Sequence, residues 1–191
     1  MKEFAVTILA AGALVGVRAV ARGQPLTVMH LFSCFDPRAG PLLILGLLYL
    51  AGWFVIWLVA AVMLVAIAGL GTLSAVLAGD AVDATIGAMA AIGIAAVVVL
   101  AVMALFAVPL LMAIWFAPAL VVFAGVEPVA AMKASFSACL VNVLPFLLYN
   151  LIGLGLAVLA TIPLGLGWLV FAPVLAGSVY ASYVDVFGAA D

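Results

Sequence analysis

The chain has 191 residues, of which 72% are hydrophobic and 6% are charged, and its mean hydropathy is +1.60. Soluble domains are about half apolar and about a quarter charged, and a folded chain of this size still exposes a large area to its solvent. The composition therefore excludes a water-soluble protein and predicts an integral membrane protein with a single transmembrane domain over residues 1–191.

Long stretches of the chain carry no charged residue. They lie between Arg38 and Asp80, between Asp83 and Glu127, and between Lys133 and Asp185. Each is longer than the roughly 20 apolar residues that a membrane-spanning helix needs. The runs are continuous, whereas membrane β-strands alternate polar and apolar residues. We therefore predict an all-α fold, a polytopic membrane helix bundle with about five transmembrane helices and two short interfacial amphipathic helices.

The first predicted span covers residues 4–21. Arg18 lies near its end, where a long basic side chain can reach the interface. Gly12 and Gly16 form a small-residue pattern that suits close packing of membrane helices, either within the chain or between two copies. A cleaved signal peptide that begins at Lys2 is the alternative, but an arginine directly before the supposed cleavage site argues against it.

Two connectors, over residues 23–41 and 125–145, resemble one another. Each has a Gly-Pro turn signal, then a phenylalanine and a cysteine, and then a proline that opens an apolar run. An internal repeat indicates a repeated structural role. We predict that residues 26–35 and 129–141 form short amphipathic helices, here called elbows, that lie in the membrane interface.

The second span is predicted over residues 41–68. Gly69 and Gly71 should weaken the helix there, because glycine is a poor helix former. A polar linker over residues 74–85 should then separate the second span from the third.

The third span is predicted over residues 86–108, with a kinked extension to residue 123. Pro109 and Pro118 each remove a helical hydrogen bond, so the segment is either one kinked helix or two. A stripe of small residues suits contact with another helix: Gly87, Ala91 and Ala95. The fourth and fifth spans are predicted over residues 143–162 and 168–186, joined by a tight turn.

The basic residues predict how the bundle is oriented. The first connector carries Arg18, Arg22 and Arg38 and the third carries Lys133, whereas the second and fourth have no basic residue. Cytoplasmic loops carry the excess of lysine and arginine, so both elbows should face the cytoplasm. Five spans then put the amino terminus outside and the carboxyl terminus inside. Lys2 is the one basic residue that this orientation leaves on the wrong side.

The span centres contain no ionisable residue, although ion-coupled carriers commonly have one there. The notable polar side chains within the spans are Asn150, Thr161 and Ser178. In a membrane bundle such residues more often form interhelical hydrogen bonds than bind a substrate. No Ser/His/Asp set, acidic metal motif or phosphate loop can be assembled, so we expect no catalytic residue, no cofactor and no enzyme.

Three residues are candidate metal ligands. His30 and Cys34 are four apart on one helical face, and Cys139 occupies the matching place in the second elbow. Three ligands without a CxxC or HxxxH spacing are weak support for zinc. We therefore expect no metal site and interpret both cysteines as reduced thiols at packed surfaces.

Several short motifs along the chain carry a family resemblance. They are Trp115-Phe-Ala-Pro118, Pro128-x-x-Ala-Met-Lys-Ala-Ser-Phe136 and Ile162-Pro-Leu-Gly-Leu-Gly-Trp168. With these motifs the chain resembles a family of small bacterial inner-membrane proteins of unknown function. The resemblance implies no catalytic or binding residue. It implies six spans in the full form, so this chain looks like a short or amino-terminally truncated member with five.

We therefore expect a multi-pass protein of the bacterial inner membrane with a structural, accessory or assembly role. Its expected partners are the lipid bilayer and either a protein docked on the elbows or a second copy held through small-residue helix faces, with no nucleic acid. The alternative is a facilitator of a small neutral or apolar solute near Asn150.

Overall fold

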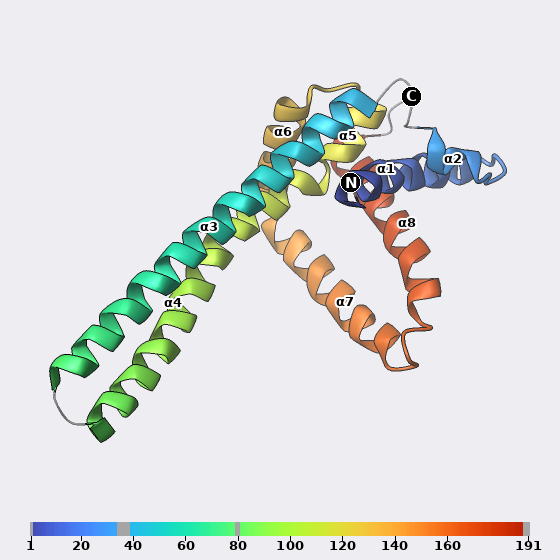
Figure 1. Ribbon diagram of the computed structural model, residues 1–191. Coiled ribbons are helices and arrows are strands. Elements are labelled where there is room, and N and C mark those ends of the chain that lie inside the picture. Colours follow the sequence, from blue (N-terminus) through green and yellow to red (C-terminus); the bar gives the residue numbers. More distant parts are fainter. Residues whose placement is uncertain (1, 34–38, 79–80, 189–191) are drawn as a thin grey trace. The chain divides into compact units, whose positions relative to one another are not determined.

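The computed structural model confirms the all-α fold, with no strand among the residues that it describes. These are residues 2–33, 39–78 and 81–188, with side chains over 11–30, 33, 39–74, 76–77 and 85–188. The helices of this part of the chain are α1 (Lys2–Ala21), α2 (Met29–Phe32), α3 (Ala39–Ala78), α4 (Ala81–Trp115), α5 (Ala117–Phe123), α6 (Pro128–Val141), α7 (Val143–Thr161) and α8 (Trp168–Phe187) (Figure 1).

Four segments are long and apolar enough to cross a membrane, which supports a membrane-embedded protein. They are Ala39–Ser74 in α3, Thr85–Phe123 through α4 and α5, α7, and α8. Helix α1, which corresponds to the first predicted span, is not among the four. Its described side chains begin at Ala11, and Ala11–Ala21 is shorter than a bilayer crossing. The chain groups into two compact units, Tyr49–Leu111 and the remainder, Met1–Leu48 with Met112–Asp191.

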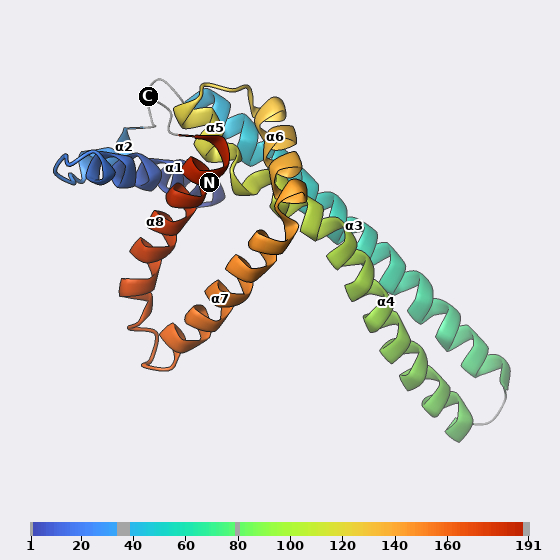
Figure 2. The same ribbon diagram turned by 180° about the vertical axis from the view of Figure 1, so that it is seen from behind.

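The hairpin unit, Tyr49–Leu111, consists of α3 and α4 running antiparallel and side by side (Figures 1 and 2). Two contacts fix their register. A Cβ atom on Gly52 would lie 2.8 Å from the Leu110 side chain, and one on Gly71 would lie 2.5 Å from the Cβ of Ala91. Two glycines thus let the helices approach at both points, as small residues do in membrane bundles.

The predicted end of the second span at residue 68 is wrong, because α3 continues through Gly69 and Gly71 to Ala78. The polar linker predicted over 74–85 is wrong for the same reason, since α4 already begins at Ala81; residues 79–80 lie outside the described part. The Thr72 and Ser74 hydroxyls donate to the carbonyls of Gly69 and Gly71, at 2.9 Å and 2.8 Å. Because these hydroxyl groups form hydrogen bonds with carbonyls of their own helix, the polar residues do not end it.

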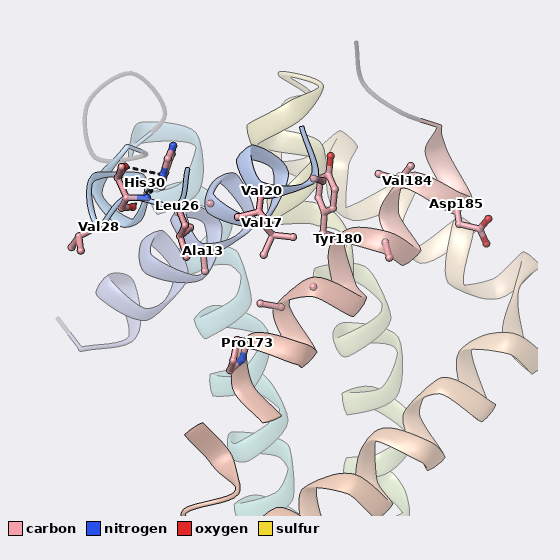
Figure 3. Close-up of a pocket in the computed structure, with 17 residues that line it drawn as sticks. Ala13, Val17, Val20, Leu26, Val28, His30, Pro173, Tyr180, Val184 and Asp185 are labelled. Carbon is pink, nitrogen blue, oxygen red and sulfur yellow. Dashed lines mark hydrogen bonds between the residues drawn. The ribbon is translucent and has the colours of Figure 1, made fainter. Parts of the chain in front are cut away.

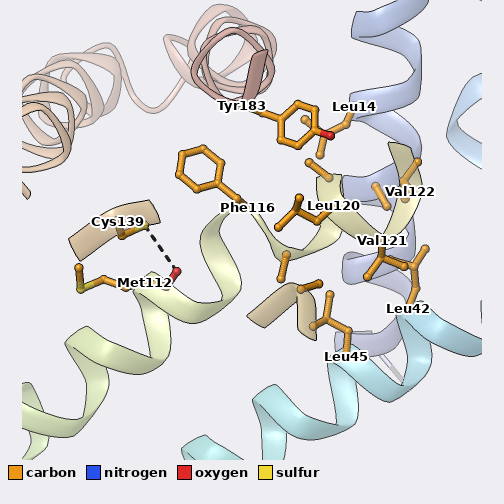
Figure 4. Packing of buried hydrophobic residues seen from close by; sticks show 14 residues of the cluster. Leu14, Leu42, Leu45, Met112, Phe116, Leu120, Val121, Val122, Cys139 and Tyr183 are labelled. Atoms are coloured by element: carbon orange, nitrogen blue, oxygen red, sulfur yellow. Dashed lines mark hydrogen bonds between the residues drawn. The ribbon is translucent and has the colours of Figure 1, made fainter. Parts of the chain in front are cut away.

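The core unit, Met1–Leu48 with Met112–Asp191, is built around α5 (Figure 4). The short helix has almost no exposed side chain, and Val122 is completely buried. Leu14 of α1, Leu42 and Leu45 of α3, and Tyr183 of α8 complete the buried cluster around it. The elements that precede and follow the hairpin unit therefore share one hydrophobic core.

The segment 86–123, for which the sequence leaves one kinked helix or two open, is two helices. Pro109 lies inside α4, and the chain breaks at Phe116 before α5. The Ser135 hydroxyl of α6 enters this break. It donates to the Met112 carbonyl at 2.7 Å and accepts from the Phe116 amide at 2.9 Å. Because Met112 and Phe116 are the two partners of one helical hydrogen bond, the serine replaces that bond with a bridge of two.

The glycines that open the two connectors both adopt the left-handed conformation, with φ of 73° at Gly23 and 64° at Gly125. Gly23 ends α1 in a Schellman motif: its amide donates to Val20, and that of Gln24 donates to Ala19. Residues other than glycine rarely adopt this φ. The Gly-Pro signal therefore marks a helix end in both connectors.

Candidate functional site

The two elbows differ in length. Helix α6 covers Pro128–Val141, close to the predicted 129–141, whereas α2 is a single turn over Met29–Phe32 within the predicted 26–35; residues 34–35 lie outside the described part. Helix α6 buries one stripe of side chains and exposes Lys133 and Ser137 on another. Its buried stripe consists of Ala131, Ser135 and Cys139.

The three residues weighed as metal ligands have different surroundings. The Cys139 thiol is 1% exposed and donates to the Met112 carbonyl at 3.6 Å. Burial raises the pKa of this thiol to about 11, which disfavours the thiolate that binds metals. The His30 Nδ1 atom accepts the Thr27 amide at 3.1 Å. Cys34 lies outside the described residues, and among those described no three potential ligands gather.

The polar residues of the spans are occupied by hydrogen bonds. Ser178 of α8 and Tyr149 of α7 bond through their hydroxyls at 2.6 Å, and the Trp168 indole donates to Thr161 at 3.2 Å. Both bonds link α7 to α8, as predicted. For Asn150 the structure shows a bond within one helix and not the predicted bond between helices, because its side-chain amide donates to the Phe146 carbonyl of α7 at 2.8 Å.

An open groove of about 1090 Å³ lies in the core unit, between the α1–α2 segment and α8 (Figure 3). One wall comes from α1, through small and aliphatic residues such as Ala13, Val17 and Val20. The other comes from α8, between Pro173 and Asp185. We refer to it as the α1/α8 groove.

The α1/α8 groove has few polar side chains, and they lie away from its Pro173 end (Figure 3). Tyr180 and Asp185 contribute them from α8, and Thr27 and His30 from the elbow. The described lining includes no lysine or arginine. An apolar cavity with a few polar groups is the usual form of a small-molecule site, so this geometry suits binding an apolar molecule with a polar end.

Helix α1 is held in place by an aromatic cluster. The Arg18 guanidinium lies 4.9 Å from the centre of the Phe123 ring of α5. That ring in turn contacts Tyr180 and Tyr183 of α8 at centroid distances of 5.7 Å and 5.6 Å. A cation over an aromatic face contributes about 0.5–1 kcal/mol when exposed and more when desolvated. The α1 wall of the groove is thereby fixed to α5 and α8.

The small-residue pattern of α1 is used within the chain. Gly16 is buried, and a Cβ atom added to it would lie 2.9 Å from the Leu26 side chain. The segment after α1 therefore packs directly on this glycine.

The α1/α8 groove is not among the features that the sequence predicts. A signal was available in Ala176 and Gly177, which are small residues at the middle of an otherwise bulky span. The pairing of α8 with α1 could not be read from the sequence, because the two helices are separated by nearly the whole chain.

Comparison with known proteins gives no match to any family model, any curated protein or any solved structure.

Proposed function

We propose that this chain is a multi-pass protein of the bacterial inner membrane with a structural, accessory or assembly role, exerted through docking of a protein partner on α6. The single observation that carries the proposal is that α6 is held in a fixed position with one face exposed. Ser135 anchors its buried stripe to the α4–α5 break, and Lys133 and Ser137 face outward from the opposite side. A rigid exposed helix face of this kind loses little entropy when a partner binds.

The orientation that we propose has both termini in the cytoplasm. Helix α1 lies across the end of α8 rather than alongside it (Figures 1 and 2). The described residues contain four candidate spans, and an even number of spans returns the chain to the side on which it starts. All five basic residues then share one side, including Lys2, and the segments on the other side have none. The four-span arrangement thus agrees better with the charge rule than the five-span one.

A facilitator of a small neutral or apolar solute is the alternative. It depends on Asn150 as a polar group available to a solute, and that amide is engaged by Phe146. Asn150 also does not line the α1/α8 groove. The docking role is therefore the better supported of the two.

Photo-crosslinking in living cells tests the docking role. A photoreactive residue at Ser137, on the exposed face of α6, should give a discrete protein adduct. The matched control is Leu151, which is 64% exposed on the membrane-spanning α7 and should give lipid adducts only. Lipid adducts alone at both positions, under all growth conditions, would rule out docking on α6.

A further inference from the structure

The α1/α8 groove is about as long as the acyl chain of a lipid. Its α8 wall extends from Pro173, the sixth of the 20 residues of α8, to Asp185, near the end of that helix. At ~1.5 Å per residue these positions are about 18 Å apart. Half of a ~30 Å hydrocarbon core is about 15 Å. The groove is therefore long enough for an acyl chain of one leaflet.

The walls of the groove leave room for an occupant. Small residues line both sides, yet a Cβ atom added to Gly177 would meet no atom within 4 Å. The volume of about 1090 Å³ is slightly above the roughly 300–1000 Å³ of ligand pockets. Helix α8 is long and apolar enough to span the membrane. In a bilayer the molecules that surround the opening are lipids, and an acyl chain fits an apolar space beside them.

The polar end of the groove selects a headgroup. Asp185 is an exposed carboxylate, and the described lining has no lysine or arginine. A carboxylate at the interface attracts an ammonium group and repels an anionic headgroup. Tyr180, five residues earlier on α8, adds a neutral hydroxyl group.

We propose that the α1/α8 groove binds one phospholipid with a primary-ammonium headgroup. One acyl chain lies along α8 from Asp185 toward Pro173, and the ammonium group pairs with the Asp185 carboxylate. The proposal depends on the membrane location of α8 and not on docking at α6, so either one can fail without the other. A second copy of the chain is the other occupant to consider, but Leu26 already covers Gly16, where a partner helix would approach most closely.

Native mass spectrometry of the purified chain in mild detergent tests the proposal, with phosphatidylethanolamine and phosphatidylglycerol of identical acyl chains added in turn. The unchanged protein should retain one phosphatidylethanolamine and about tenfold less phosphatidylglycerol. Gly177→Leu fills the groove and should lose this retention. The matched control is Gly155→Leu on α7, where an added Cβ also meets open space but no groove residue is changed; it should behave as the unchanged protein.

The variant Asp185→Asn tests the preference for the headgroup separately from the binding of the acyl chain. This variant keeps the groove and should retain both lipids equally, which also gives a reading if Gly177→Leu does not fold. Equal retention of phosphatidylethanolamine by Gly177→Leu and the unchanged protein would overturn the site. Equal retention of the two lipids by the unchanged protein would overturn the role of Asp185, and dimers without lipid would identify a second copy as the occupant.

Discussion

A single hydroxyl group decides where α4 ends. A serine hydroxyl is both a donor and an acceptor, so Ser135 can serve the Met112 carbonyl and the Phe116 amide at once. The side chain is completely buried, with an exposed fraction of 0%. A residue that cannot accept a hydrogen bond would leave the Phe116 amide without this partner, whereas the Met112 carbonyl would keep only the bond from the Cys139 thiol.

Ser135→Ala should therefore destabilise the protein. Leaving a buried backbone donor or acceptor unsatisfied costs about 1–3 kcal/mol, so the free energy of unfolding should fall by about that amount. Denaturant unfolding in detergent measures it. Ser137→Ala is the matched control, because Ser137 is exposed on the same helix and its loss should change the free energy by less than about 0.5 kcal/mol. Equal effects of the two changes would show that the bridge does not stabilise the break.

At the scale of helices, the hairpin unit distinguishes two glycines that look alike in the sequence. Gly69 and Gly71 both lie inside α3, and both weaken a helix by their conformational freedom. A Cβ atom on Gly69 would meet nothing within 4 Å, whereas one on Gly71 would overlap Ala91. Of these two glycines, only Gly71 takes part in the contact between α3 and α4.

The two glycines should respond in opposite directions to alanine. Gly71→Ala should destabilise the hairpin by about 1–3 kcal/mol, because the added methyl group forces the helices apart. Gly69→Ala should stabilise it by up to about 1 kcal/mol through helix propensity. Thermal unfolding in detergent, followed by circular dichroism, compares the two variants. A loss of stability in Gly69→Ala as large as in Gly71→Ala would contradict the packing argument.

The sequence predicted helices well where long apolar runs determine them, and less well at their ends. The predicted fourth and fifth spans, 143–162 and 168–186, lie within one residue of α7 and α8 at each end. The end of α3 was missed because Thr72 and Ser74, read as loop residues, bond to their own helix. The groove was missed because it depends on which helices become neighbours, and periodicity within one helix contains no such information.

At the scale of the whole molecule, the number of spans and the positions of the basic residues are linked. Five spans leave Lys2 apart from the other four basic residues, whereas four spans place all five together. Lysine and arginine near short loops determine orientation. The difference lies in α1, which either crosses the bilayer or lies at its surface.

Labelling of single cysteines distinguishes the two arrangements. We expect Glu3→Cys and Gln24→Cys, in a chain without native cysteines, to react with a membrane-impermeant maleimide from the cytoplasmic side only. Leu164→Cys should react only from the opposite side, because Leu164 is 98% exposed in the turn between α7 and α8. Reaction of positions 3 and 164 from the same side would make α1 a fifth span and restore an external amino terminus.

The Ser135 bridge also sets an order of assembly. Ribosomes make the chain from its amino terminus, so Met112 and Phe116 leave the ribosome before Ser135 exists to join them. The arrival of α6 supplies both bonds of the bridge at once. The bridge across the break is therefore made late in biosynthesis, and a nascent chain released before residue 135 would lack it.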